Sequence, residues 1–146
     1  MPIHSAPTAD ANLSDEGLMA AAIAAAAHAY APYSGFRVGA ALRLASGQLV
    51  TGANVENVSF GLTLCAERSA LARAVAEFGP TIRIAAVAVA NLNHAASPPC
   101  GACRQVLAEF CSPEALIHFP ALDEGKLIQL TRQFTDLMPF SFHLKP

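Results

Sequence analysis

The sequence predicts an α/β fold, a three-layer α/β/α sandwich in which helices cover both faces of one central sheet. Predicted helices and strands follow one another along the chain in the order α-β-β-α-β-α-β-β-α. In addition, Ile82–Ala90 is a nearly continuous run of alanine and β-branched residues, which is typical of a strand that is covered on both faces. The length of 146 residues fits a single domain.

Composition and charge exclude several classes of protein. Hydrophobic residues make up 53% of the chain and charged residues 14%, which excludes an intrinsically disordered protein. The formal net charge is −2, so the chain lacks the basic surplus of a nucleic-acid-binding protein. The most apolar stretch, residues 18–33, is mostly alanine and is shorter than the roughly 20 apolar residues of a membrane span. We therefore expect a cytoplasmic protein with neither nucleic acid nor membrane as its partner.

The chain is predicted to begin with an arm and a helix. Residues 1–12 show no periodicity and are expected to form a flexible arm, ahead of a single domain at residues 13–146. Ser14 is a suitable helix N-cap, and two acidic residues follow it at the positive end of the helix. This alanine-rich helix is expected to run until Pro32, because a proline disfavours helical geometry in the residue before it.

Apolar runs bounded by turn residues predict five strands. The first two form a hairpin around Ser46-Gly47-Gln48, and the last two flank the turn Asp123-Glu124-Gly125. The predicted strands are Val38–Leu44, Leu49–Val55, Ile82–Ala90, Ala115–Pro120 and Lys126–Leu130. Helical spacing and helix-ending residues predict the remaining helices, which are Cys65–Phe78, Cys100–Phe110 and Thr131–Met138.

Three cysteines lie at the predicted starts of two helices. Cys65 begins one helix, and Cys100 and Cys103 lie in the first turn of the next. Because Cys100 and Cys103 are three positions apart, both can face one point. The positive end of a helix and its unpaired N–H groups favour a thiolate there. Two converging helix starts would supply three thiolates to Zn²⁺ and leave the fourth position of a catalytic zinc site for water.

Two charged residues directly follow the first of these cysteines. Glu67 lies two positions beyond Cys65, so it can take a proton from a water whose pKa the metal lowers. The pattern Cys-x-Glu followed by Pro-Cys-x-x-Cys is the three-cysteine form of the zinc deaminase signature. Three thiolates around Zn²⁺ leave a net negative charge, and we expect Arg68 to support the thiolates and offset that charge. The alternative for Arg68 is an exposed position on the helix surface.

Two other chemistries share parts of this pattern. An isolated Cys-x-x-Cys is often a redox pair, but that function would leave Cys65 and Glu67 without a role. A structural zinc site needs a fourth ligand, and Cys111 lies about two helical turns beyond Cys103. Cys111 is therefore expected to be a small buried apolar residue. The five histidines show no ligand spacing and remain unassigned.

Several segments of the sequence resemble the small, homotetrameric cytidine deaminases. The match covers nearly the whole chain after the first dozen residues, and in combination the motifs are highly specific. The segments are residues 33–42 (YSGFRVGAAL), 53–57 (ANVEN), 63–68 (TLCAER), 97–106 (SPPCGACRQV) and 137–142 (LMPFSF).

The resemblance implies a mixed five-stranded sheet between helices and a homotetramer with its sites at subunit interfaces. It also implies hydrolytic deamination of cytidine and 2′-deoxycytidine to uridine and 2′-deoxyuridine in pyrimidine salvage, with release of ammonia. Carried over by motif, Cys65, Cys100 and Cys103 bind one Zn²⁺ per subunit. Glu67 is then the proton shuttle of the reaction.

The resemblance further implies which residues contact the nucleoside. Asn54 and Glu56 match positions that bind the ribose 3′-hydroxyl, and Ala66 is a further substrate contact. Phe36 matches an aromatic residue that packs on the pyrimidine, and Phe142 one that reaches in from a neighbouring subunit. Without the cysteine motif, Asn54 and Glu56 would be interpreted as part of a polar loop. By pattern alone, the two phenylalanines would be interpreted as core residues.

Other functions stay open at this point. Deaminases of nucleic acids usually begin their zinc motif with His-x-Glu, whereas the motif in this chain begins with Cys65. The chain also lacks a basic channel for a nucleic acid. A deaminase of a related aminopyrimidine nucleoside, such as blasticidin S, shares the zinc motif. A non-catalytic, zinc-stabilised binding module would need the cysteines but not Glu67. Phe60 stands where the family often has tyrosine, so a sugar contact through that hydroxyl is not expected here.

Overall fold

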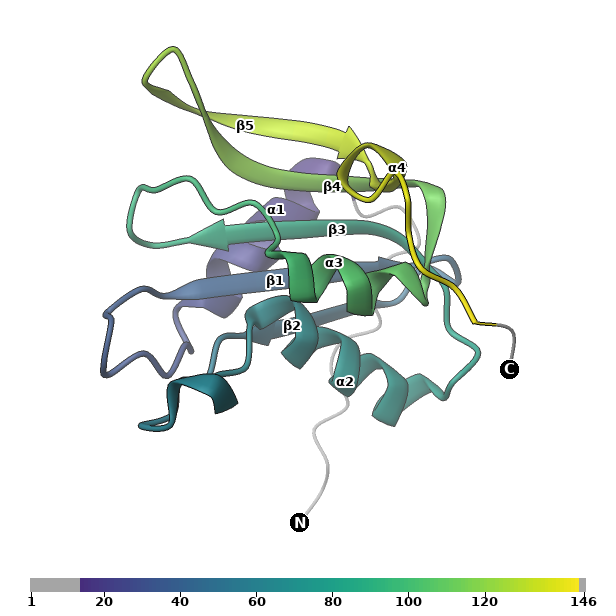
Figure 1. Cartoon of the computed structure of the whole chain (residues 1–146), viewed down its shortest axis with the longest axis horizontal. Coiled ribbons are helices and arrows are strands. Elements are labelled where there is room, and N and C mark those ends of the chain that lie inside the picture. The colour runs from purple at the N-terminus through teal and green to yellow at the C-terminus, as the bar shows by residue number, and fades with distance from the viewer. Residues whose placement is uncertain (1–13, 145–146) are drawn as a thin grey trace.

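A computed structural model describes residues 14–144 of the chain, and the predicted arm at residues 1–12 lies outside them. The described residues form one five-stranded sheet with the strand order β2-β1-β3-β4-β5 (Figure 1). β3 and β4 pair in parallel, and the other neighbouring strands pair antiparallel, so the sheet is mixed, as expected. The strands are β1 (Val38–Leu44), β2 (Leu49–Ala53), β3 (Ile84–Asn91), β4 (Cys111–Asp123) and β5 (Lys126–Gln133).

Helices cover both faces of this sheet, which confirms the predicted three-layer sandwich (Figure 1). α1 packs on one face against alanines of β1 and β3, and α2, α3 and α4 pack on the other around one buried apolar cluster. None of the helices within residues 14–144 has the length and apolar character to cross a bilayer. The helices are α1 (Asp15–Ala26), α2 (Ala66–Phe78), α3 (Gly101–Ala108) and α4 (Phe134–Leu137), with a 3₁₀ turn at Phe60–Leu62.

Glycines in the two strands of the first hairpin let helices approach the sheet closely. A Cβ on Gly39 of β1 would lie 2.0 Å from the backbone oxygen of Ala22 in α1. On the opposite face, a Cβ on Gly52 of β2 would lie 2.4 Å from the backbone nitrogen of Ala70 in α2. Neither position has room for a side chain, so α1 and α2 rest directly on the strand backbones. This contact fixes where α2 begins relative to the sheet.

The first helix is shorter than the sequence predicts. Ser14 caps α1 as expected, but α1 ends at Ala26 and not at Pro32. Tertiary contacts end the helix early, because Tyr30 pairs in an extended conformation with the segment that follows β2. Its N–H donates to the carbonyl of Asn54 at 3.0 Å, and its carbonyl accepts from the N–H of Glu56 at 2.8 Å.

The C-terminal elements also differ in length from the prediction. β4 begins at Cys111 and not at Ala115, and β5 continues to Gln133. The two strands pair along the whole of β5, up to Leu116 opposite Gln133, so residues 131–133 join the sheet. The final helix therefore keeps only Phe134–Leu137 of the predicted Thr131–Met138.

Candidate active site

The first turns of α2 and α3 lie side by side on the same face of the sheet (Figure 1). Cys65 is the N-cap residue of α2, Cys100 is the N-cap residue of α3, and Cys103 lies in the first turn of α3. Neither N-cap cysteine uses its side chain to cap its helix. The thiols are therefore directed to each other and not to the helix backbone.

The three thiols form a cluster with the dimensions of a zinc site. Their Sγ atoms all lie within 4.8 Å of one another, and those of Cys65 and Cys100 are 3.9 Å apart. Tetrahedral zinc with Zn–S bonds of about 2.3 Å requires sulfur atoms about 3.8 Å apart, so the three thiols fit Zn²⁺ as ligands. Within residues 14–144 the cluster has three members and no fourth protein ligand, which is the donor count of a catalytic zinc site.

Cys111 is not part of this cluster. It is a free cysteine on β4 that packs against the apolar core on the face of α2 and α3. Burial raises the pKa of its thiol to about 12. Cys111 is only partly buried, whereas the sequence predicts a buried residue, but it packs as an apolar side chain and lies outside the metal-ligand cluster of the described residues.

The thiols of the cluster differ in their affinity for protons. The pKa of Cys65 is lowered to about 5, first by a hydrogen bond from the Cys103 thiol and then by Arg68. The pKa of Cys103 is raised, first because its proton is held in the hydrogen bond to Cys65 and then by burial. The cluster therefore already favours a thiolate at Cys65, which is the form that a zinc ligand requires.

Arg68 lies against the thiol cluster. Its Nη2 donates to Cys65 Sγ at 3.4 Å and to the carbonyl of Thr63 at 3.3 Å. The side chain is partly buried and not freely solvated. Arg68 thus places a positive charge next to the sulfur that most readily becomes a thiolate.

Glu67 is the buried carboxylate of the site. It is the second residue of α2, it is 5% exposed, and its Oε2 lies 3.6 Å from Cys103 Sγ. Burial raises the pKa of this carboxyl group. A carboxylate with a raised pKa next to a metal site is suited to accept a proton and to return it.

The cluster opens into a cavity of about 250 Å³ on this face of the sheet. Glu67, Cys65 and Cys100 line it, and so do four of the five residues that the resemblance assigns to substrate binding. These four are Phe36, Asn54, Glu56 and Ala66. The fifth, Phe142, does not line the cavity and is 67% exposed near the end of the described chain.

Asn54 and Glu56 are both engaged with the loop that carries Phe36. Asn54 accepts from the N–H of Val38 and donates to the carbonyl of Phe36, each at 2.8 Å. Glu56 accepts from the N–H of Tyr33 at 2.9 Å and from the N–H and hydroxyl of Ser34. The Ser34 hydroxyl is the main reason that the pKa of Glu56 is lowered. The two residues thus build one wall of the cavity.

Sequence reasoning missed several residues that line the cavity. Ser34, Thr63, Ser97 and Pro98 all lie in segments that carry the resemblance, but nothing in their spacing predicts a role. Their place depends on how distant loops meet, and a single sequence does not reveal that.

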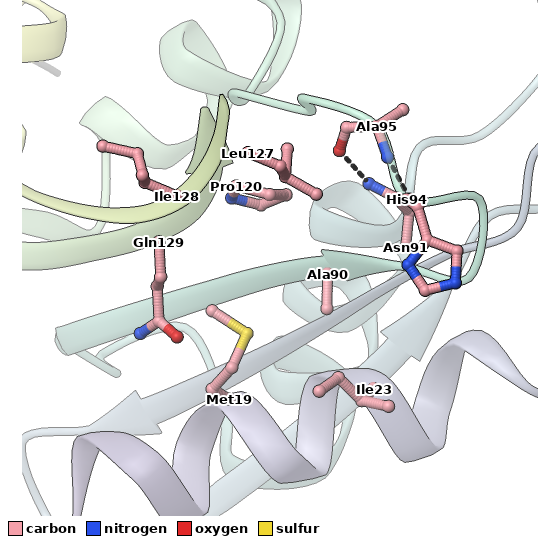
Figure 2. Close-up of a pocket in the computed structure, with 10 residues that line it drawn as sticks. All are labelled: Met19, Ile23, Ala90, Asn91, His94, Ala95, Pro120, Leu127, Ile128 and Gln129. Atoms are coloured by element: carbon pink, nitrogen blue, oxygen red, sulfur yellow. Dashed lines mark hydrogen bonds between the residues drawn. The ribbon is translucent and has the colours of Figure 1, made fainter. Parts of the chain in front are cut away.

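A second cavity, of about 240 Å³, lies on the opposite face between α1 and the β4–β5 hairpin (Figure 2). Its walls are mainly apolar, with Met19 and Ile23 from α1 and Leu127 and Ile128 from β5. It contains none of the site residues that the sequence predicts. The candidate catalytic residues therefore share one face of the sheet.

Three thiols at two helix starts, with a buried carboxylate beside them in an α/β/α sandwich, define a zinc-dependent deaminase. The family model of the cytidine and deoxycytidylate deaminase zinc-binding region matches residues 13–118. The chain belongs to this family.

Relatives and solved structures agree with this assignment. The chain is 44% identical over 125 residues to a cytidine deaminase of Halalkalibacterium halodurans, which covers 86% of this chain and 91% of that protein. It is 44% identical over 120 residues to a cytidine deaminase of Mycobacterium tuberculosis, covering 82% and 83%. The crystal structure of cytidine deaminase from Burkholderia pseudomallei superposes with a TM-score of 0.76 at 41% identity, covering 88% and 99%. That of the Mycobacterium tuberculosis enzyme gives 0.74 at 42% identity, covering 90% and 99%.

Proposed function

We propose that this protein deaminates cytidine and 2′-deoxycytidine hydrolytically to uridine and 2′-deoxyuridine, as a step of pyrimidine salvage. Each turnover consumes one water and releases one ammonia. The observation that carries the proposal is the buried carboxylate of Glu67, 3.6 Å from the thiol cluster at the cavity. Membership of the cytidine and deoxycytidylate deaminase family supports the same chemistry.

Glu67 moves the protons of the reaction. Cys65, Cys100 and Cys103 would hold Zn²⁺, and the bound ion would act as a Lewis acid that lowers the pKa of the attacking water toward neutrality. The Glu67 carboxylate accepts a proton from the attacking water and delivers it to N3 of the pyrimidine as the oxygen adds to C4. It then passes the second proton to the departing amine. Its raised pKa suits both directions of transfer.

The walls of the cavity supply the contacts for a nucleoside. Phe36 presents an aromatic ring for the pyrimidine, and Ala66, the first residue of α2, offers a backbone N–H without a partner inside the helix. Asn54 retains a second amide hydrogen, and Glu56 retains acceptor capacity on a charged carboxylate. We assign this donor and acceptor pair to the ribose 3′-hydroxyl.

The assembly that we propose is a homotetramer in which Phe142 of a neighbouring subunit completes the site. The end of the described chain exposes three large apolar side chains, Phe140 at 96%, Phe142 at 67% and Leu144 at 78%, and such a patch is typical of an interaction surface. Sedimentation equilibrium tests the assembly, and a monomer would remove Phe142 from the site. The free thiols of the described cysteines support a reducing cytoplasm as its location.

The proposed reaction is tested by the absorbance change on cytidine, with zinc quantified in the same preparation. Glu67→Gln should keep the fold and the zinc but lose turnover about 10²- to 10⁴-fold, because it removes the general acid–base. A Glu67→Gln enzyme that deaminates cytidine at the parental rate would contradict the mechanism. A zinc-loaded parent that acts on blasticidin S but not on cytidine, or on neither, would instead favour one of the alternatives.

A further inference from the structure

Two asparagines at the end of β3 connect two loops that line the catalytic cavity. The first loop, residues 33–37, contributes Ser34 and Phe36 to the cavity, and the second, residues 95–99, contributes Ser97 and Pro98. Asn91 is the last residue of β3, and Asn93 follows two positions later. Neither asparagine lines the cavity itself.

Asn93 holds the backbone on both sides of Phe36. Its Oδ1 accepts from the N–H of Arg37 at 2.9 Å, and its Nδ2 donates to the carbonyl of Gly35 at 3.1 Å. From the other side, the Asn54 side chain binds the carbonyl of Phe36 and the N–H of Val38. The side-chain amide of Asn93 thus binds residues 35 and 37, and that of Asn54 binds residues 36 and 38. This alternation is the pattern that two neighbouring strands make with a strand between them. Phe36 is thereby fixed although it precedes β1.

Asn91 holds Asn93 in place. Its Oδ1 accepts from the N–H of Asn93 at 2.9 Å and from the N–H of Ala95 at 3.3 Å. Its Nδ2 donates to the carbonyl of Ala95 at 2.7 Å and to the Ser97 hydroxyl at 2.8 Å. Figure 2 shows the two bonds to Ala95 from the α1 side of the loop. One amide group thus sets the turn that presents Asn93 to the first loop and Ser97 to the cavity.

We propose that Asn93, oriented by Asn91, is a positioning residue for nucleoside binding. It acts through Phe36 and does not touch the substrate. This inference rests on the proposed function, because it assumes that Phe36 packs on the pyrimidine. The thiols and Glu67 lie at the N-caps and in the first turns of α2 and α3, and the side-chain hydrogen bonds of Asn93 run to none of these residues. Loss of Asn93 should therefore weaken binding and leave proton transfer unchanged.

The test compares Asn93→Ala and Asn93→Asp with a matched control, Gln129→Ala, which removes an exposed amide on β5. Both Asn93 variants lose the bond to Gly35, and Asn93→Asp keeps an acceptor for the N–H of Arg37. Loss of one or two hydrogen bonds at this site should raise KM for cytidine and the inhibition constant of uridine about tenfold. We expect kcat to stay within about threefold and the zinc content to stay unchanged, since these depend on the thiols and Glu67. Gln129→Ala should match the parent in all four quantities.

Two results would overturn the inference. One is that KM and uridine inhibition in both Asn93 variants stay equal to those of Gln129→Ala. The other is that kcat falls while KM does not, which places the effect on the chemical step. If Asn93→Ala does not fold, Asn93→Asp decides alone. Failure of the proposed function is recognised separately, because the parent enzyme itself would then not deaminate cytidine.

Discussion

The choice of residue at two helix starts determines the chemistry of this protein. Serine or aspartate at an N-cap normally accepts hydrogen bonds from the first-turn N–H groups. Here Cys65 and Cys100 occupy the N-caps without making such bonds, and their thiols meet those of the neighbouring helix instead. The thiols then depend on an external positive charge, and Arg68 supplies one at 3.4 Å.

Arg68→Ala tests this support. We expect the variant to bind zinc about 10- to 100-fold more weakly, because the partners of metal ligands contribute about that much. The loss should be larger at lower pH, since the arginine helps to lower the pKa of Cys65 and the thiol must lose its proton to bind metal. Competition with a chromophoric chelator at two pH values measures the affinity. Arg73→Ala, which removes a more exposed arginine from the same helix, is the control, and equal affinities in the two variants would contradict the role of Arg68.

The clustering of the three thiols could be predicted from sequence, and the support around the cavity could not. Cys100 and Cys103 are three positions apart on a helix, so their spacing alone predicts that they face one point. The amide of Asn93, in contrast, binds backbone groups 56 and 58 positions away. Such contacts carry no local signal, because they arise only after the sheet has brought the loops together.

At the scale of elements, the packing of the sandwich depends on how closely α1 and α2 approach the strands beneath them. Gly39 and Gly52 lie on the adjacent strands β1 and β2, and their hydrogens face α1 and α2 respectively. Backbone atoms of Ala22 and Ala70 lie directly against the two glycines. The packing of α2 against β2 also places the candidate active site, because α2 carries Glu67 at its second residue.

Alanine at either glycine should destabilise the fold. Gly39→Ala and Gly52→Ala should each lower the free energy of unfolding by about 3 kcal/mol, because the new Cβ would overlap helix backbone that must move away. Gly61→Ala is the control, since a Cβ there meets nothing within 4 Å, and we expect a change below about 0.5 kcal/mol. Urea unfolding measures all three. Equal stability of Gly39→Ala and Gly61→Ala would show that α1 lies further from β1 than described.

The elements themselves were predictable where local pattern and tertiary pairing agree. β1 has the predicted bounds, Val38–Leu44, and all its residues except Val38 and Arg43 are buried. β4 begins four residues earlier than predicted, since parallel pairing of Cys111 with Ile84 draws polar residues and Pro113 into the strand. Neighbouring strands decide such ends, and local propensity does not.

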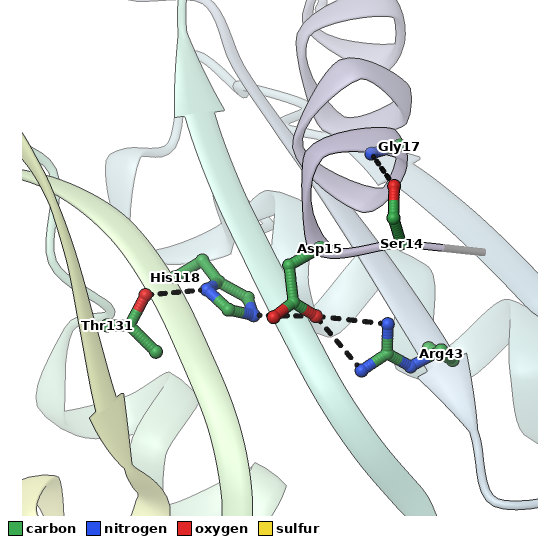
Figure 3. Close-up of polar contacts among 6 residues, drawn as sticks. All are labelled: Ser14, Asp15, Gly17, Arg43, His118 and Thr131. Carbon is green, nitrogen blue, oxygen red and sulfur yellow. Dashed lines mark hydrogen bonds and ion pairs between the residues drawn. The ribbon is translucent and has the colours of Figure 1, made fainter. Parts of the chain in front are cut away.

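For the whole molecule, a polar network ties the first helix to distant strands (Figure 3). Asp15 at the start of α1 binds both terminal nitrogens of Arg43 from β1 at 3.1 Å. His118 of β4 is buried, with its Nε2 3.5 Å from Asp15 and its Nδ1 2.8 Å from the hydroxyl of Thr131 on β5. The network thus joins four elements of the fold, α1 and β1 through Asp15 and Arg43, and β4 and β5 through His118 and Thr131.

This network should make stability depend on pH. Burial lowers the pKa of His118 and the Arg43 charge adds to this, although Asp15 opposes it. The unfolded chain therefore takes up a proton more readily, so the contribution of His118 is complete above the ordinary histidine pKa of about 6.5 and declines as the pH falls below it. Urea unfolding at pH 7.5 and pH 5.5 measures the decline. His118→Gln should lose less stability between these pH values, and an equal loss would contradict the assignment.

The 3.9 Å separation between the Sγ atoms of Cys65 and Cys100 has a consequence for the oxidation of the metal-free protein. A disulfide needs sulfur atoms about 2 Å apart, so a small shift of one helix start would let the two residues cross-link once the ion has been stripped away. A bound ion would therefore also protect the two thiols from oxidation to a disulfide. Oxidative ageing of the stripped enzyme would block reloading until a reductant reopens the bond.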